Sequence, residues 1–129
     1  MIAGIGIDTV DIEDIRSFLT DTELSRAYRE RTFTPAELET AAGRPDPAEY
    51  LAGRFAAKEA VFKALAPHTP EKTFDLRITE TLTRPDGSPY INVTDALASV
   101  MRAAGASRLH ISITAEGNFA TAFVIAESV

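Results

Sequence analysis

The stretch Leu51-Ala-Gly-Arg-Phe-Ala-Ala-Lys-Glu-Ala-Val-Phe-Lys-Ala-Leu65 belongs to the longest helix that the sequence predicts. The helix is expected to begin at Pro47, with Asp46 as its N-cap, and to end before Pro67. On a helical wheel, one apolar stripe runs along it and is formed by Leu51, Phe55, Phe62 and Leu65. The stripe predicts that one side of this helix faces the protein core.

The segments on either side of this helix differ in character. Upstream, the pattern predicts a strand over residues 2–8, a helical stripe over 12–19, a helix over 23–29 and a helix from Pro35. Downstream, the pattern of apolar and polar residues predicts strands over 74–79, 90–93, 109–114 and 119–126, with a turn at 85–87. A helix is expected over 95–104, capped by Thr94 and closed by Gly105. This order indicates an α+β fold with an antiparallel sheet and one long helix.

The composition narrows the classes of function. The 129 residues fit one domain, 1–129, and the formal net charge of −6 argues against a general nucleic-acid binder and against a protein of membrane surfaces. No apolar run approaches the length that spans a bilayer. The sequence has no cysteine, which excludes thiol chemistry, and His68 and His110 are far apart, which disfavours a histidine metal cluster. The N-terminus lacks the basic region of a signal peptide, so we expect a cytoplasmic protein.

Two charged residues of the long helix, Glu59 and Lys63, lie at an i, i+4 spacing on a face that also carries Ala52 and Ala56. A Glu–Lys pair at this spacing is commonly a helix stabiliser worth about 0.2–0.5 kcal/mol. Lys58 falls in the apolar stripe and could run its stem along the core with its ammonium in water. The alternative is a reactive site, because the small neighbours leave open space around the two charges.

Asp8 ends the first predicted strand, after Gly4 and Gly6, where backbone can approach closely. It is a candidate N-cap for the next helix and equally a candidate metal ligand. If Asp8 and Glu59 meet in space, they supply two carboxylates with lysines beside them. Because Mg²⁺ prefers one or two carboxylates plus waters and phosphate oxygens, a Mg²⁺–diphosphate site is physically coherent.

Four motifs resemble those of the holo-acyl-carrier-protein synthases, the short, trimeric type of the 4′-phosphopantetheinyl transferase superfamily. Gly4-Ile-Gly-Ile-Asp-Thr-Val-Asp11 resembles the family's opening GxGxDxxx(E/D), and the stretch from Leu51 to Ala64 resembles its helix signature (W/F)xxKExxxKA. Gly87-Ser-Pro89 resembles its GxP turn, and His110-Ile-Ser-Ile-Thr114 its HVSIT strand. The similarity runs over essentially the whole chain in the right order.

The resemblance implies a 4′-phosphopantetheinyl transferase-like fold and a reaction of fatty acid biosynthesis. Coenzyme A would donate phosphopantetheine to a serine of an acyl carrier protein, releasing adenosine 3′,5′-bisphosphate. By motif position, Asp8 and Glu59 would bind Mg²⁺, and Lys63 would contact the transferring phosphate. Glu59, Lys63 and a metal-bound water are all candidates to take the serine proton. The implied coenzyme A contacts are Arg54, Lys58 and Lys63 near the phosphates, and Gly87, Pro89, Ser112 and Thr114 around the adenine and phosphate pocket.

Three positions depart from the family's pattern. Ala115 stands where many members have a histidine that contacts a coenzyme A phosphate. Residues 66–72 stand in place of a glycine-rich loop, where Lys72 or His68 could substitute. Asp14 stands where many members carry a basic residue that faces the acidic carrier.

The acidic first helix leaves two possibilities for the carrier, because like charges across an interface cost affinity. Either a free acidic carrier docks on a neighbouring basic segment, or the carrier is a less acidic domain embedded in a multifunctional synthase. The basic residues available for docking are Arg26, Arg29 and Arg31.

Two other classes of function stay open. One is a binding or regulatory module for coenzyme A or the carrier that has kept the fold and lost activity. Ala115 favours it, and the joint presence of Asp8, Glu59 and Lys63 disfavours it. The other is a Mg²⁺-dependent nucleotide hydrolase, which the missing Walker-type loop disfavours.

The last predicted strand, 119–127, is apolar on both of its alternating faces. A chain of this size has limited means to cover both faces. Together with the resemblance, this predicts a homotrimer that uses part of the sheet and shares each active site between two subunits.

Overall fold

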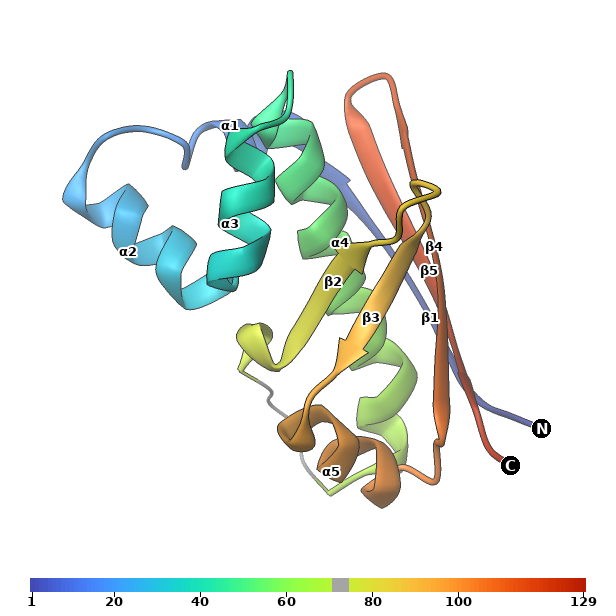
Figure 1. Ribbon diagram of the computed structural model, residues 1–129. Coiled ribbons are helices and arrows are strands. Elements are labelled where there is room, and N and C mark those ends of the chain that lie inside the picture. Colours follow the sequence, from blue (N-terminus) through green and yellow to red (C-terminus); the bar gives the residue numbers. More distant parts are fainter. Residues whose placement is uncertain (71–74) are drawn as a thin grey trace.

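The computed structural model describes residues 1–70 and 75–129. Its elements, in chain order, are β1 (Ile2–Asp11), α1 (Ile12–Arg16), α2 (Glu23–Thr32), α3 (Pro35–Ala42), α4 (Pro47–Leu65), β2 (Thr79–Thr83), β3 (Pro89–Val93), α5 (Asp95–Ala103), β4 (Arg108–Glu116) and β5 (Phe119–Glu127) (Figure 1). Single 3₁₀ turns, η1 and η2, occupy Ala66–His68 and Leu76–Ile78. Among these described residues, no helix is long and apolar enough to cross a membrane.

The strands form two antiparallel sheets around α4. β5 lies between β1 and β4 in a three-stranded sheet, and β2 pairs with β3 in a separate hairpin. Figure 1 shows the three-stranded sheet on one side of α4 and α2 and α3 on the other. The helix packs on β1 and β5 and also contacts α1, α3 and β2. The expected α+β fold with antiparallel sheets and one long helix is thus confirmed.

Two glycines let β1 lie directly on the backbone of α4. A methyl group built on Gly6 would stand 1.8 Å from the carbonyl oxygen of Ala60, and one on Gly4 would stand 2.0 Å from that of Ala64. No side chain fits at these distances, so the expected close approach is confirmed. This contact brings the part of β1 that carries Asp8 to the second half of the helix, and the strand runs on past the expected end at Asp8 to Asp11.

Several local signals are confirmed. Thr34 and Glu37 form a capping box at α3, and Asp46 caps α4 with Pro47 in the first turn. Thr94 caps α5, and Gly105 and Gly87 have φ of +76° and +91°, as the predicted helix end and turn require.

Some boundaries differ from the expectation. The segment expected as a strand over 74–79 begins outside the described residues, and Leu76–Ile78 is a 3₁₀ turn, so β2 starts only at Thr79. The reason is local, because the Asp75 carboxylate accepts a hydrogen bond from the Arg77 backbone N–H and caps the turn. The first helix ends at Arg16, before the expected stripe is complete, and α2 continues to Thr32.

The two faces of β5 differ in exposure. Ala120, Ala122, Val124 and Ala126 face α4 and are fully buried. On the other face, Phe119 is 51% and Phe123 39% exposed, so a single chain covers only one of the two apolar faces. Ile7 pairs with Phe123 across the β1–β5 ladder, and Ile5 and Ile7 are likewise exposed. The outer sheet face therefore carries a patch of exposed apolar side chains.

Candidate active site

Asp8 and Lys63 meet where β1 crosses α4. The Lys63 ammonium donates to Asp8 Oδ1 at 2.9 Å and to the backbone carbonyl of Ile7 at 3.1 Å. The Asp8 side chain is 16% exposed and that of Lys63 50%. Asp8 does not cap the first helix, because Asp11 accepts from the Glu13 N–H in that role. Its carboxylate is left for the charged cluster.

Glu59 completes this cluster, one turn of α4 before Lys63. Partial burial raises the pKa of its carboxyl, the nearby charge of Asp8 raises it further, and Lys63 lowers it. The carboxylate of Glu59 therefore lies near enough to Asp8 and Lys63 for the charge of each to act on it. The sequence left open whether Asp8 and Glu59 come near one another, and the structure brings them within this range. We refer to Asp8, Glu59 and Lys63 as the acidic–lysine cluster.

The donor set of this cluster suits Mg²⁺. Two carboxylates that repel each other gain from a divalent cation between them, and Mg²⁺ takes its remaining ligands from water and phosphate oxygens. In the described part of the chain, no group of three or more His, Cys, Asp or Glu side chains gathers to enclose a metal.

Lys58 lies outside the acidic–lysine cluster, and its surroundings differ from those expected for a coenzyme A contact. Its ammonium is 2.8 Å from Glu37 Oε1, both side chains are 0% exposed, and it donates to the carbonyl oxygens of Leu76 and Thr79. Burial lowers the pKa of the lysine, and the Glu37 charge counteracts this. The expected role near the coenzyme A phosphates does not fit this position, because Lys58 is enclosed between α3, α4 and β2. Its contacts tie these three elements together.

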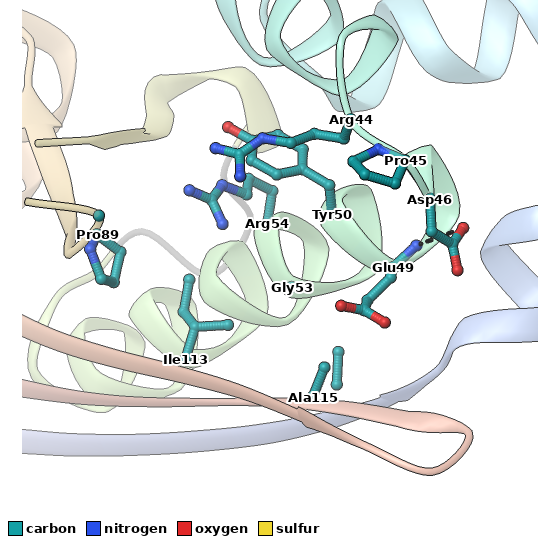
Figure 2. Close-up of a pocket in the computed structure, with 12 residues that line it drawn as sticks. Arg44, Pro45, Asp46, Glu49, Tyr50, Gly53, Arg54, Pro89, Ile113 and Ala115 are labelled. Carbon is teal, nitrogen blue, oxygen red and sulfur yellow. Dashed lines mark hydrogen bonds between the residues drawn. The ribbon is translucent and has the colours of Figure 1, made fainter. Parts of the chain in front are cut away.

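A pocket of about 550 Å³ opens along the first half of α4 (Figure 2). Arg54, Gly87 of the β2–β3 turn and Pro89 at the start of β3 all line it, so the structure brings these three expected residues together. Its wall on β4 is formed by Ile113 and Ala115. Ser112 and Thr114, which were expected there, do not line this pocket, because strand alternation turns them to the outer sheet face.

Arg54 is 8% exposed and donates to the Thr83 hydroxyl at 2.8 Å. Burial lowers its pKa. Its guanidinium lies 4.0 Å from the centroid of the Tyr50 ring, and that of Arg44 lies 4.8 Å from the same centroid. Sequence reasoning missed Arg44 and Tyr50 as pocket residues. The i, i+4 spacing of Tyr50 and Arg54 was the available signal, because it puts the two side chains on one helix face.

Comparison with known proteins shows the family of this chain. The sequence pattern of the 4′-phosphopantetheinyl transferase superfamily matches residues 4–124. A holo-[acyl-carrier-protein] synthase from Salinispora arenicola is 41% identical over 127 residues, which cover 98% of this chain and 99% of that protein.

Solved structures give the same result. The crystal structure of holo-[acyl-carrier-protein] synthase from Neisseria meningitidis has a TM-score of 0.84 and 32% identity, covering 99% of this chain and 100% of that chain. A holo-(acyl-carrier-protein) synthase from Bacillus anthracis, solved in complex with CoA (3′,5′-ADP), has a TM-score of 0.77 and 30% identity, covering 100% of this chain and 99% of that one. The expected resemblance is therefore confirmed, and the chain belongs to the 4′-phosphopantetheinyl transferase superfamily as a member of the short holo-[acyl-carrier-protein] synthase type.

Proposed function

We propose that this enzyme transfers the 4′-phosphopantetheine group of coenzyme A to a serine hydroxyl of an acyl carrier protein or carrier domain. The observation that carries the proposal is the acidic–lysine cluster. Asp8, Glu59 and Lys63 come from two elements far apart in sequence and meet at a half-exposed position. The matched relatives are named for this reaction, and one is solved with coenzyme A.

The proposed step balances as a phosphoryl transfer. The serine oxygen forms a bond to the phosphorus that carries pantetheine, and the bond from that phosphorus to the bridging diphosphate oxygen breaks. Adenosine 3′,5′-bisphosphate leaves, and the serine gives up its proton. Asp8 and Glu59 would hold Mg²⁺, which supplies neutralisation of the charge on the diphosphate.

Lys63 and Glu59 have further parts in this step. The Lys63 ammonium is half exposed and can turn from Asp8 to a phosphate oxygen without leaving the cluster. Partial burial raises the carboxyl pKa of Glu59, and a raised pKa makes its carboxylate a better proton acceptor. Glu59 and Lys63 are the two groups of this chain that we assign to the serine proton.

The proposal includes a homotrimer with shared active sites, supported by two observations. The outer sheet face exposes Ile5, Ile7 and Phe123 side by side. Moreover, no residue of the acidic–lysine cluster lines the pocket, whose lining residue on α4 nearest to the cluster, Arg54, lies about 7.5 Å before Glu59 along the helix axis at 1.5 Å per residue. A site that needs both parts is completed when the pocket of one subunit faces the cluster of the next. The proposed location is the cytoplasm.

The direct test of the activity follows the release of adenosine 3′,5′-bisphosphate from coenzyme A, with and without an apo carrier and Mg²⁺. Release that requires both supports the proposal. Thermal shifts with coenzyme A identify the alternative, a module that binds coenzyme A and releases nothing. Sedimentation at micromolar concentration tests assembly, and an active monomer would contradict the shared site.

A further inference from the structure

We propose that the buried ion pair of Lys58 and Glu37 takes the place of a third strand at the open edge of β2. In this role the two side chains serve the strand backbone as a hydrogen-bond donor and a hydrogen-bond acceptor, and their charges are secondary. This inference goes beyond the proposed transfer reaction and does not depend on it. We refer to Lys58 and Glu37 as the edge pair.

The first observation is that β2 has a buried edge. Among the strands of the described chain, β2 pairs with β3 alone, so its other side has no neighbouring strand. This side is shielded from water, because Thr79 is 2% and Thr81 0% exposed. A buried backbone N–H or C=O without a partner is costly, so this edge needs donors and acceptors from outside the sheet.

The second observation is the direction of the backbone groups along β2. The ammonium of Lys58 donates to the carbonyl oxygen of Thr79 at 2.6 Å. The N–H of Thr81 donates to Glu37 Oε2 at 3.1 Å. In an antiparallel pair, successive residues turn their backbone groups alternately toward the partner strand and away from it. Thr79 and Thr81 therefore face the open edge, and Leu82 faces β3.

The third observation is that the edge pair supplies what a neighbouring strand would supply. A strand at this edge would give an N–H to the Thr79 carbonyl oxygen and a C=O to the Thr81 N–H. The edge pair gives an ammonium and a carboxylate instead, and the 2.8 Å contact between Lys58 Nζ and Glu37 Oε1 keeps the donor and the acceptor side by side. The ammonium also reaches the carbonyl oxygen of Leu76 at 3.1 Å, in the 3₁₀ turn before the strand.

The edge pair joins the hairpin to two helices. A hairpin of two strands is marginally stable unless it packs on something else. Here β2 contacts α3, which carries Glu37, and α4, which carries Lys58 (Figure 1). The same hairpin carries Gly87 in its turn and Pro89 at the start of β3, both in the pocket wall. Side chains of the two helices, rather than a third strand, thus fasten this part of the pocket.

Charge alone predicts a different result from edge closure. Replacing both partners of a buried ion pair by apolar residues of similar size is often neutral or stabilising, because the desolvation of two charges offsets their attraction. Both side chains of the edge pair are 0% exposed, so the same result would be expected here. If the pair closes the edge, the replacement instead leaves the Thr81 N–H and the Thr79 carbonyl oxygen without partners in the protein interior.

The test compares two double variants that both remove the two charges, Lys58→Met with Glu37→Gln and Lys58→Met with Glu37→Met. Glutamine keeps a carbonyl oxygen for the Thr81 N–H, whereas methionine keeps only the apolar volume. We expect urea unfolding to show a folding equilibrium constant about tenfold lower for the methionine pair, the effect of one buried donor left without a partner. Equal or greater stability of the methionine pair would overturn the proposal.

Amide hydrogen exchange measures the edge directly. It is needed because Glu37 also accepts from the Thr34 N–H, so stability alone mixes the edge with the helix cap. The matched control is the Leu82 N–H, which faces β3 opposite Tyr90. In the methionine pair we expect the Thr81 N–H to exchange at least about tenfold faster relative to that of Leu82 than in wild type.

Two results of the exchange measurement would overturn the proposal. One is an unchanged ratio of the Thr81 and Leu82 exchange rates in the methionine pair. The other is a Thr81 N–H that exchanges freely in wild type, a measurement that requires no variant to fold. Slow exchange of Thr81 in wild type and in the glutamine variant, with fast exchange in the methionine pair, supports the closed edge.

Discussion

The ammonium of Lys63 lies 2.9 Å from the carboxylate of Asp8, across the contact at which β1 touches the backbone of α4. The pair joins residues 55 positions apart in sequence. Its position depends on Gly4 and Gly6, since any larger residue would push the strand off the helix. The packing of the fold and the placing of the reactive groups therefore rest on the same two glycines.

Removing either carboxylate of the cluster should abolish most of the transfer. We expect Asp8→Ala and Glu59→Ala each to lower kcat/KM at least about 100-fold, because charge neutralisation at a transferring phosphate contributes several kcal/mol. The measurement is the initial rate with saturating Mg²⁺, with circular dichroism melting to establish that each variant folds. Near-normal turnover of Glu59→Ala would contradict the metal-binding role of Glu59 and leave it as a salt-bridge partner of Lys63 on the helix.

Lys63→Ala should lower kcat more than it raises KM for coenzyme A. The reason is that the ammonium is proposed to meet charge that develops on the phosphate during transfer. Steady-state kinetics at varied coenzyme A concentration give both constants. An effect confined to KM would assign Lys63 to ground-state phosphate binding instead.

Gly6→Ala should destabilise the fold strongly. Its added methyl group would stand 1.8 Å from the Ala60 carbonyl oxygen, and overpacking of this kind costs about 1–3 kcal/mol or more. The matched control is Gly43→Ala, where the nearest atom is 3.7 Å away and φ is −92°. Urea unfolding of both variants makes the comparison, and equal midpoints would contradict the close approach of β1 to α4.

Lys58→Met should lower the free energy of unfolding of the protein. The affinity of the folded protein for coenzyme A should stay unchanged. Removing one partner of a buried ion pair costs about 3–5 kcal/mol, because Glu37 then keeps an uncompensated charge. The double variant Lys58→Met with Glu37→Gln should regain part of the lost stability, because the buried carboxylate charge is then also removed. If Lys58→Met instead binds coenzyme A weakly at unchanged stability, the lysine belongs to the phosphate site after all.

Arg26 and Arg29 should respond differently to charge reversal. The Arg29 guanidinium donates to the carbonyl oxygens of Phe18 and Thr20 and fixes the loop before α2, so Arg29→Glu should mainly lower the melting temperature. Arg26 is half exposed and pairs only with the exposed Asp21 among the described residues. We expect Arg26→Glu to reduce kcat/KM for the preferred carrier and to flatten its salt dependence.

The carrier measurement compares a free acidic carrier with an embedded carrier domain at low and moderate salt. We would attribute a preference for the embedded domain to Glu13 and Asp14 of the first helix, because these acids repel a free acidic carrier. If Arg26→Glu changes neither kcat/KM nor its salt dependence, the carrier docks on another part of the surface.

Local signals in the sequence predicted much of the fold. Thr34 with Glu37, and Asp46 with Pro47, are capping patterns whose geometry lies within a single turn, so they could be identified without the rest of the chain. The Gly4–Gly6 spacing pointed to close packing. By contrast, the ion pair between Glu37 and Lys58 was not predicted. The sequence near Glu37 indicates only its capping role and not that the same carboxylate contacts a lysine of another helix.

The pocket was the least predictable part. Alternation along β4 separates Ser112 and Thr114 from Ile113 and Ala115, but it does not say which set faces the helix. Polar residues were expected in the pocket, whereas packing against α4 turns the apolar set inward. Arg44 lies outside any regular element, so its contact with Tyr50 depends on how the chain enters α4.

The central claim is tested most directly by the intact mass of an apo carrier after incubation with this enzyme, coenzyme A and Mg²⁺. The account predicts a gain of one phosphopantetheine group, absent when the carrier serine is replaced by alanine and absent with Asp8→Ala enzyme. A carrier whose mass stays unchanged with folded wild-type enzyme, across free and embedded carriers, would contradict it.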